Sequence, residues 1–196
     1  QPRTAVELAP TFVEYGAGLA QVGCRVERYF LHQAQNFDLD KRFLSFLEEK
    51  KPEVVFLCNP NNPTGRLIPL PLLEQILQYC AAQGARLFLD ECFLDLTEDG
   101  VSAKSLLAAH PELLILKAFT KSYGMAGIRL GYCLCADNAL LRRMAARLTD
   151  MADQLHAGAA GEQDVMGFFA EGDPFRRYKA AVTHAGITAA QDGTAT

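Results

Sequence analysis

Residues 113–135 read LLILKAFTKSYGMAGIRLGYCLC. The stretch opens and closes with apolar runs, 113–116 and 130–135, which predict two β-strands. Between the runs stand a lysine directly after a threonine, two glycines and an arginine eight residues beyond the lysine. Glycine lets the backbone approach a ligand closely, and arginine binds anions well. The stretch therefore predicts a strand, a ligand-binding loop and a second strand.

The same alternation of strand and helix patterns continues along the chain. Apolar runs predict strands over residues 5–8, 24–30, 54–58, 87–89, 113–116 and 130–135. Helical periodicity predicts helices over residues 12–21, 40–49, 70–82, 103–109 and 138–148. Several strand segments are apolar on both faces, as in a parallel sheet that helices cover. The pattern predicts an α/β domain whose ligand groups lie at the carboxyl ends of the strands.

Length and composition predict one main domain. The 196 residues are 49% hydrophobic, which suffices for one substantial core, and we place this domain at residues 1–150. Residues 151–196 are rich in Ala, Gly, Asp, Gln and Thr, and we expect little order there apart from a helix over 162–170. The chain begins with Gln1 rather than methionine and enters a strand-like segment at once. We therefore expect an internal fragment of a longer protein.

Charge and apolar patterning argue against several function classes. The net charge is -4, the isoelectric point is about 5.6 and no basic block occurs, which disfavours nucleic acid or an anionic membrane as partner. No apolar stretch approaches the roughly 20 residues that span a bilayer, so we expect a soluble, cytoplasmic protein. The six cysteines are scattered through apolar segments. They predict buried reduced thiols rather than disulfides or a zinc site.

Lys121 is the candidate nucleophile. A lysine can form an imine with an aldehyde cofactor, and Thr120 and Arg129 stand at spacings suited to a phosphate on that cofactor. Pyridoxal phosphate is the cofactor with this chemistry. The alternatives are a solvated surface lysine and an arginine that pairs with a surface carboxylate.

Three further residues fit the same cofactor. Asp90 ends a predicted strand, where a buried carboxylate can keep a pyridine nitrogen protonated or can simply cap the next helix. Asn62 lies in a turn before Pro-Thr-Gly, from which its amide can donate to a phenolic oxygen. Phe12 can lie flat on a cofactor ring or belong to the core, and Tyr15 has the same two interpretations. Two nearby acids receive structural roles, Glu91 and Asp95.

Together these motifs resemble the class I and II aminotransferases, which are fold type I pyridoxal phosphate enzymes. The resemblance covers residues 2–149 and rests on three motifs in the family order: Asn62 with Pro-Thr-Gly, Asp90 in Leu-Asp-Glu-Cys-Phe, and Thr120-Lys121 followed by Gly-Ile-Arg-Leu-Gly-Tyr. It is strongest to the branch that contains threonine-phosphate decarboxylase and histidinol-phosphate aminotransferase. The resemblance implies a three-layer α/β sandwich with a mostly parallel sheet, here an incomplete large domain. It also implies a homodimer when complete and an amino acid or amino phosphate as substrate.

The resemblance assigns a role to each candidate residue. Lys121 would form the Schiff base with pyridoxal phosphate, and Asp90 would pair with the pyridine nitrogen of the cofactor. The other implied contacts are Asn62 at the phenolic oxygen, Thr120 and Arg129 at the phosphate, and Phe12 on the ring.

The chain departs from the family pattern at two positions. Phe93 stands where the aminotransferases carry a tyrosine, three residues past the aspartate. This departure favours the decarboxylase, an enzyme of cobalamin synthesis, over the transaminase. Ala118 stands where many relatives have a hydroxyl that contacts the phosphate. The alternatives from other classes are a non-catalytic ligand-sensing domain and an inactive remnant.

Overall fold

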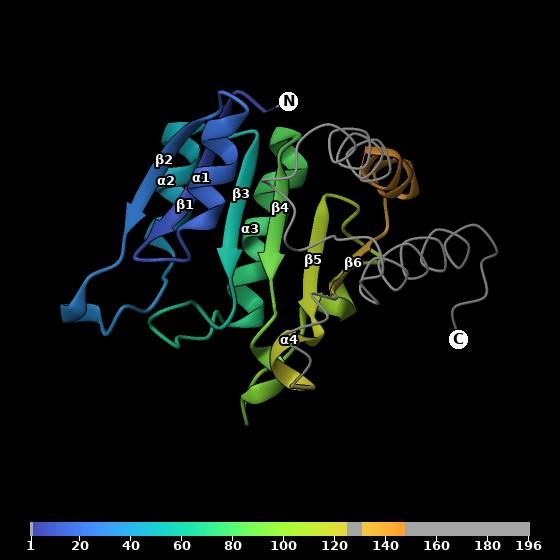
Figure 1. Cartoon of the computed structure of the whole chain (residues 1–196). Coiled ribbons are helices and arrows are strands. Elements are labelled where there is room, and N and C mark those ends of the chain that lie inside the picture. The colour runs from blue at the N-terminus through green and yellow to red at the C-terminus, as the bar shows by residue number, and fades with distance from the viewer. Residues whose placement is uncertain (1, 125–130, 148–196) are drawn as a thin grey trace, which may run out of the picture. The chain divides into compact units, whose positions relative to one another are not determined.

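Six strands form one mixed sheet (Figure 1). A computed structural model describes residues 2–124 and 131–147. The strands in chain order are β1 (Thr4–Ala9), β2 (Arg25–Phe30), β3 (Val54–Cys58), β4 (Arg86–Asp90), β5 (Leu113–Ala118) and β6 (Gly131–Cys135). They lie in the order β2-β1-β3-β4-β5-β6, with the first five parallel and β6 antiparallel to β5. The predicted α/β fold with a mostly parallel sheet is confirmed.

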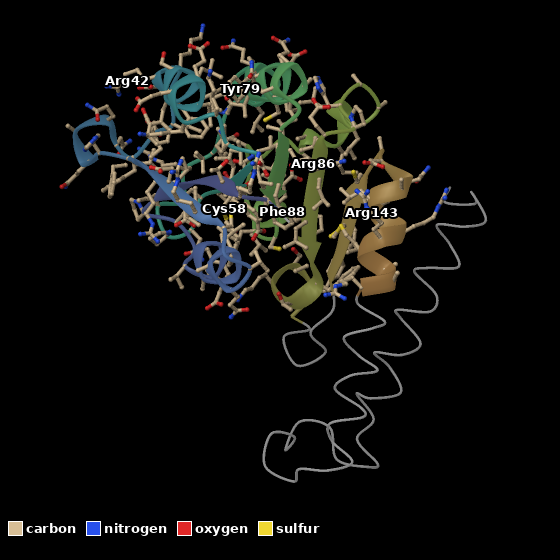
Figure 2. All side chains as sticks on the ribbon, turned by 90° about the horizontal axis from the view of Figure 1, so that it is seen from above. Arg42, Cys58, Tyr79, Arg86, Phe88 and Arg143 are labelled. Carbon is tan, nitrogen blue, oxygen red and sulfur yellow. The ribbon has the colours of Figure 1, made fainter. Side chains whose placement is uncertain are left out.

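Helices cover both faces of this sheet, which gives three layers (Figure 2). They are α1 (Glu14–Gln21), α2 (Arg42–Lys50) and α3 (Leu70–Gln83), with the short α4 (Phe119–Ser122) after β5. From β1 the chain moves outward to β2 and then returns across β1 to β3. Because parallel crossovers are right-handed, this reversal places α1 on one face and α2 and α3 on the other.

The face that α2 and α3 cover, here called the packed face, holds the main core. Leu57, Leu89 and Ile115 lie in register on β3, β4 and β5, and all three are fully buried. They belong to the same buried cluster as Ile76 and Leu77 of α3. Each such side chain contributes about 1.5–3 kcal/mol by leaving water, so this face supplies most of the stability.

The face that α1 covers, here called the site face, has a smaller buried apolar cluster and includes buried acidic residues. Its buried cluster contains Ala5, Leu19 and Cys24. Glu7 is buried on the same side; its Oε1 accepts from Arg28 Nε at 2.8 Å, and Oε2 has no partner among the described residues. A Cβ added at Gly16 would lie 2.9 Å from Glu7 Oε1, so a larger residue there would displace the Glu7 carboxylate.

One predicted helix, over residues 103–109, is wrong. The segment forms a 3₁₀ helix at Ala103–Leu106 instead, and the described residues contain two more, at Gln33–Gln35 and Leu94–Leu96. The backbone hydrogen bonds of this segment join residues three apart, as from Leu107 N to Lys104 O at 3.2 Å and from Ala109 N to Leu106 O at 3.2 Å, which is the tighter 3₁₀ pattern.

The chain divides into two units, residues 1–136 and 137–196, and the sheet belongs to the first. In the second unit, residues 138–147 are helical, within the predicted range of 138–148. The helix predicted over 162–170 lies outside the described residues. The domain boundary placed at residue 150 stays a prediction.

Candidate functional site

The carboxyl ends of the parallel strands gather the predicted residues at one edge of the sheet. Phe12 follows β1, Asn62 follows β3, and Asp90 is the last residue of β4. Thr120 and Lys121 lie in α4, directly after β5. Parallel strands end at the same edge, so the order of the motifs along the chain becomes proximity in space.

Asp90 is held by two hydrogen bonds on the site face. Its Oδ2 accepts from the hydroxyl of Tyr15 at 2.5 Å, and its Oδ1 accepts from the backbone N–H of Cys92 at 2.9 Å. The side chain is 8% exposed. An ionised carboxylate has about four lone-pair positions, and these two bonds leave some of them for another donor.

A cleft of about 360 Å³ opens beside Asp90. It lies between α1 and the central strands, with Phe12 and Tyr15 on one side and Phe56, Phe88 and Leu116 on the sheet. The structure therefore brings together two of the predicted residues, Phe12 and Asp90, at one apolar cleft. Asn62, Thr120 and Lys121 do not line this cleft.

Lys121 is exposed and approaches the same region from α4. Its ammonium Nζ lies 5.4 Å from the centre of the Phe93 ring, which comes from the loop after Asp90. Phe93 thus lies beside Lys121 and, unlike a tyrosine at this position, offers no hydroxyl there. Thr120, in the same short helix, is half-buried.

A second lysine near the edge, Lys117, is engaged in ion pairs. It is buried, and its Nζ lies 2.7 Å from Asp95 Oδ1 and 3.7 Å from Glu91 Oε2. Glu91 is fully buried and also accepts from Ser102 Oγ at 2.6 Å and Ala103 N at 2.8 Å. These contacts agree with the structural roles predicted for Glu91 and Asp95. They also leave Lys121 as the lysine of this region that is accessible to a ligand.

Three asparagines around the turn after β3 have different functions. Asn59 Oδ1 accepts from Ile68 N at 2.8 Å, and Asn61 bonds Thr11, Pro10 and Thr64. Both therefore stabilise the turn. The amide of Asn62 is half-buried and makes no side-chain hydrogen bond within the described part of the chain.

The predicted phosphate ligand Arg129 lies outside the described residues. Gly124, which ends the described part of that loop, has a φ of 64°, which is a left-handed conformation suited to glycine. No cluster of three or more potential metal ligands occurs in the described ranges, and no helix there is long and apolar enough to cross a membrane.

The sequence analysis left Tyr15 open between ring and core, and the structure gives it a third position as the donor to Asp90. Burial, and then the nearby Cys58 and Asp90, raise the pKa of the Tyr15 hydroxyl far above its ordinary value. The spacing of Phe12 and Tyr15 at the start of a helix was the available signal, since it places both on one face. That spacing does not reveal the order of the strands, so the proximity of α1 to β4 could not be predicted from it.

Burial also raises the pKa values of two thiols next to Asp90, those of Cys58 and Cys92. Raised values favour neutral thiols, which are weak nucleophiles. None of the six cysteines forms a disulfide, as predicted, but only Cys24, Cys58 and Cys80 are buried; Cys92, Cys133 and Cys135 are partly exposed.

A fold with three layers, a mostly parallel sheet and a lysine and an aspartate at adjacent strand ends defines a class of cofactor-binding α/β domains. The comparison with protein families identifies the class: the chain belongs to the family Aminotransferase class I and II, whose model matches residues 3–173. Members of this family are pyridoxal phosphate enzymes that act on small amino acid substrates.

Two curated relatives and one solved structure illustrate the likeness. Threonine-phosphate decarboxylase from Salmonella typhimurium is 37% identical over 164 residues, which are 83% of this chain and 44% of that protein. Histidinol-phosphate aminotransferase from Ruminiclostridium cellulolyticum is 32% identical over 129 residues, 65% of this chain and 35% of that protein. A decarboxylase structure from Sulfurospirillum multivorans is 30% identical with a TM-score of 0.66, covering 76% of this chain and 42% of that one. The chain spans less than half the length of these proteins.

Proposed function

We propose that this chain is the cofactor-binding part of a pyridoxal phosphate enzyme that decarboxylates an amino acid phosphate, as threonine-phosphate decarboxylase does. The observation that carries the proposal is the Phe93 ring beside Lys121, at the position where the aminotransferases have a tyrosine. The identity of 37% to threonine-phosphate decarboxylase supports it further.

The described residues fit the cofactor. Asp90 keeps acceptor positions beyond those that Tyr15 and Cys92 fill, and a ring nitrogen carries the kind of donor that would fill one of them. Lys121 has an exposed amine, whereas Lys117 is buried among carboxylates. Phe12 is 40% exposed at the cleft and offers an aromatic face to a planar ring.

When bound, pyridoxal phosphate supplies an electron sink for a bond broken at the substrate Cα. The residues of the chain would bind and orient it. Lys121 would hold the cofactor's carbonyl carbon covalently, Asp90 would accept a hydrogen bond from the protonated ring nitrogen, and Asn62 would donate to the phenolic oxygen. We assign the remaining contacts from the family motif alone, with Thr120 and Arg129 at the phosphate.

The second candidate is transamination of histidinol phosphate or a related amino phosphate, which the relative from Ruminiclostridium cellulolyticum favours. In that reaction the substrate amine takes the place of Lys121 on the cofactor, and the freed amine of Lys121 would then also move the proton from Cα. In the decarboxylase the carboxylate leaves Cα as carbon dioxide and the Cα proton stays, so a proton must be added to Cα rather than removed from it.

The two reactions are separated by their products. With threonine phosphate, the decarboxylase releases carbon dioxide and needs no keto acid, whereas the transaminase consumes one keto acid for each amine transferred. We expect carbon dioxide release without a keto acid. Strict dependence on a keto acid would establish the transaminase. Bound cofactor without either reaction would favour the sensing domain or the inactive remnant.

We also infer that the complete protein is a cytoplasmic homodimer. Several large apolar side chains are exposed in the described residues, including Val13, Phe30 and Tyr123, each more than 60% exposed. Exposed apolar side chains of this size are typical of surfaces that a partner covers. Light scattering is expected to show self-association, and a stable monomer at high concentration would contradict it.

A further inference from the structure

Among the contacts that the proposed chemistry does not use, the hydrogen bond from Tyr15 to Asp90 has the shortest distance and a direct connection to the site. It joins α1 to the end of β4, 75 residues apart in the sequence, and both side chains are buried. A hydrogen bond to an ionised acceptor is stronger and more directional than one between neutral groups.

Tyr15 is itself held in place. Its ring lies 5.5 Å from that of Phe12 in an edge-to-face contact and 5.6 Å from that of Phe56, which belongs to β3. The residue is only 8% exposed. Because Phe12, just before α1, and Phe56, in β3, both contact the ring, the hydroxyl has little freedom to leave Asp90.

The two bonds to Asp90 fix both oxygens of its carboxylate. Cys92 N–H binds Oδ1 and the Tyr15 hydroxyl binds Oδ2, so the plane of the group is set by the loop on one side and by α1 on the other. Loss of the Tyr15 bond would leave the carboxylate attached to the loop alone. A carboxylate held by one oxygen can rotate, and its remaining lone pairs would no longer point in one direction.

We propose that Tyr15 is a positioning residue that orients the Asp90 carboxylate toward the ring nitrogen of the cofactor. The inference rests on the proposed function, because it requires pyridoxal phosphate at this site. Phe12 lies just before α1 and Tyr15 lies in its first turn, so one short segment would both meet the face of the ring and orient the group that binds its nitrogen. The raised pKa of the Tyr15 hydroxyl agrees with this role, since a neutral phenol can only donate to a carboxylate.

The Tyr15→Phe variant tests the inference, because it removes the hydroxyl and keeps the aromatic packing. Tyr79→Phe is the matched control: the Tyr79 hydroxyl also makes one hydrogen bond, to Leu47 O at 2.6 Å, and it lies on the α3 side of the sheet (Figure 2). The readout is the ¹⁵N NMR signal of pyridoxal phosphate labelled at the ring nitrogen and bound to the protein, followed as a function of pH.

A well-oriented carboxylate keeps the ring nitrogen protonated to higher pH. We expect the midpoint of the ¹⁵N titration to fall by about one pH unit in Tyr15→Phe, the size expected for one lost hydrogen bond to a charged group, and to stay unchanged in Tyr79→Phe. In an Asp90→Asn background, Tyr15→Phe should have no further effect, since Tyr15 acts through Asp90.

The outcomes separate this inference from the proposed function. Wild-type protein that fails to bind the labelled cofactor would overturn both. Wild-type protein that binds it, with the same titration midpoint in Tyr15→Phe, would overturn the positioning role alone. A drop in thermal stability of Tyr15→Phe with an unchanged midpoint would show that the hydrogen bond is only structural.

Discussion

Two neighbouring carboxylates at the end of β4, Asp90 and Glu91, have opposite surroundings. Glu91 is fully buried, and its oxygens accept from Ser102 and Ala103 and lie near the buried ammonium of Lys117. Asp90 accepts two bonds and borders an apolar cleft. The charge of one acid is compensated by an ammonium of its own chain, whereas the other acid borders an open space.

The difference gives a criterion for separating structural from functional acids. Burial alone fails, because both residues are less than 9% exposed. The number of partners also fails, because both have two hydrogen-bond donors. What separates them is the nearby cation: Lys117 compensates Glu91, whereas the donors to Asp90 are a neutral hydroxyl and an amide. An uncompensated buried carboxylate is costly, and it is retained where a ligand completes it.

The largest expected effect belongs to the lysine that the ion pairs leave accessible. Borohydride reduction of the protein with pyridoxal phosphate should attach the cofactor to Lys121, and Lys121→Ala should abolish the label. Turnover should fall by a factor on the order of 10²–10⁴ or more, because that range covers the loss of one acid–base group and the covalent attachment is lost as well. Peptide mass spectrometry locates the label.

Lys104→Ala is the control for this experiment, since Lys104 is exposed but lacks the threonine before it and the arginine eight residues beyond it that accompany Lys121. It should keep both the label and the turnover. A label on Lys117 or Lys104 in the wild-type protein would contradict the assignment of Lys121.

Removing the charge of Glu91 should affect stability. Glu91→Gln keeps the shape of the side chain but deprives the buried Lys117 of one carboxylate; because Asp95 still contacts Lys117, we expect a loss above about 1 kcal/mol but below the roughly 3–5 kcal/mol of a fully broken buried ion pair. Asp95→Asn is the matched variant at the other partner; its side chain is 52% exposed, so its cost should stay below about 1 kcal/mol. Urea unfolding measures both, and equal losses would contradict the distinction between the two acids.

The corresponding change at Asp90 should affect catalysis instead. Asp90→Asn keeps the hydrogen-bonding shape and should retain the borohydride label on Lys121. It should raise the activation barrier by about 3 kcal/mol, the size found when a single electrostatic partner is removed from an active site. Measurement of kcat/KM and of the free energy of unfolding tests this. A variant that loses stability but keeps its turnover would show that Asp90 is a structural acid.

Much of this architecture could be predicted from the sequence because its signals are local. The strands are short apolar runs, and Asp90, Asn62 and Lys121 follow three of them, so parallel pairing alone brings their positions to one edge. The role of Tyr15 could not be predicted, because its partner lies 75 residues away and depends on which face α1 covers. The helix predicted over 103–109 was wrong because the segment forms hydrogen bonds between residues three apart, and apolar periodicity over so few residues does not separate this 3₁₀ pattern from an α-helix.

The buried thiols on the two faces of the sheet should make the free energy of unfolding depend on pH in alkaline solution. Burial raises the pKa of Cys80, in the packed-face core, from 9.0 to about 12. A raised folded-state pKa means that the unfolded chain loses its proton first, so the contribution of this thiol is complete below pH 9 and is lost as the pH rises toward 12. Each pH unit within that window should lower the free energy of unfolding by about 1 kcal/mol.

Cys80→Ala should therefore show a constant offset below pH 9 and a shallower decline above it, measured by urea unfolding from pH 7 to 11. Cys58→Ala provides the comparison on the site face, where the thiol pKa is also raised by burial. Parallel stability curves for the wild type and Cys80→Ala across this range would show that the thiol does not titrate as its burial requires.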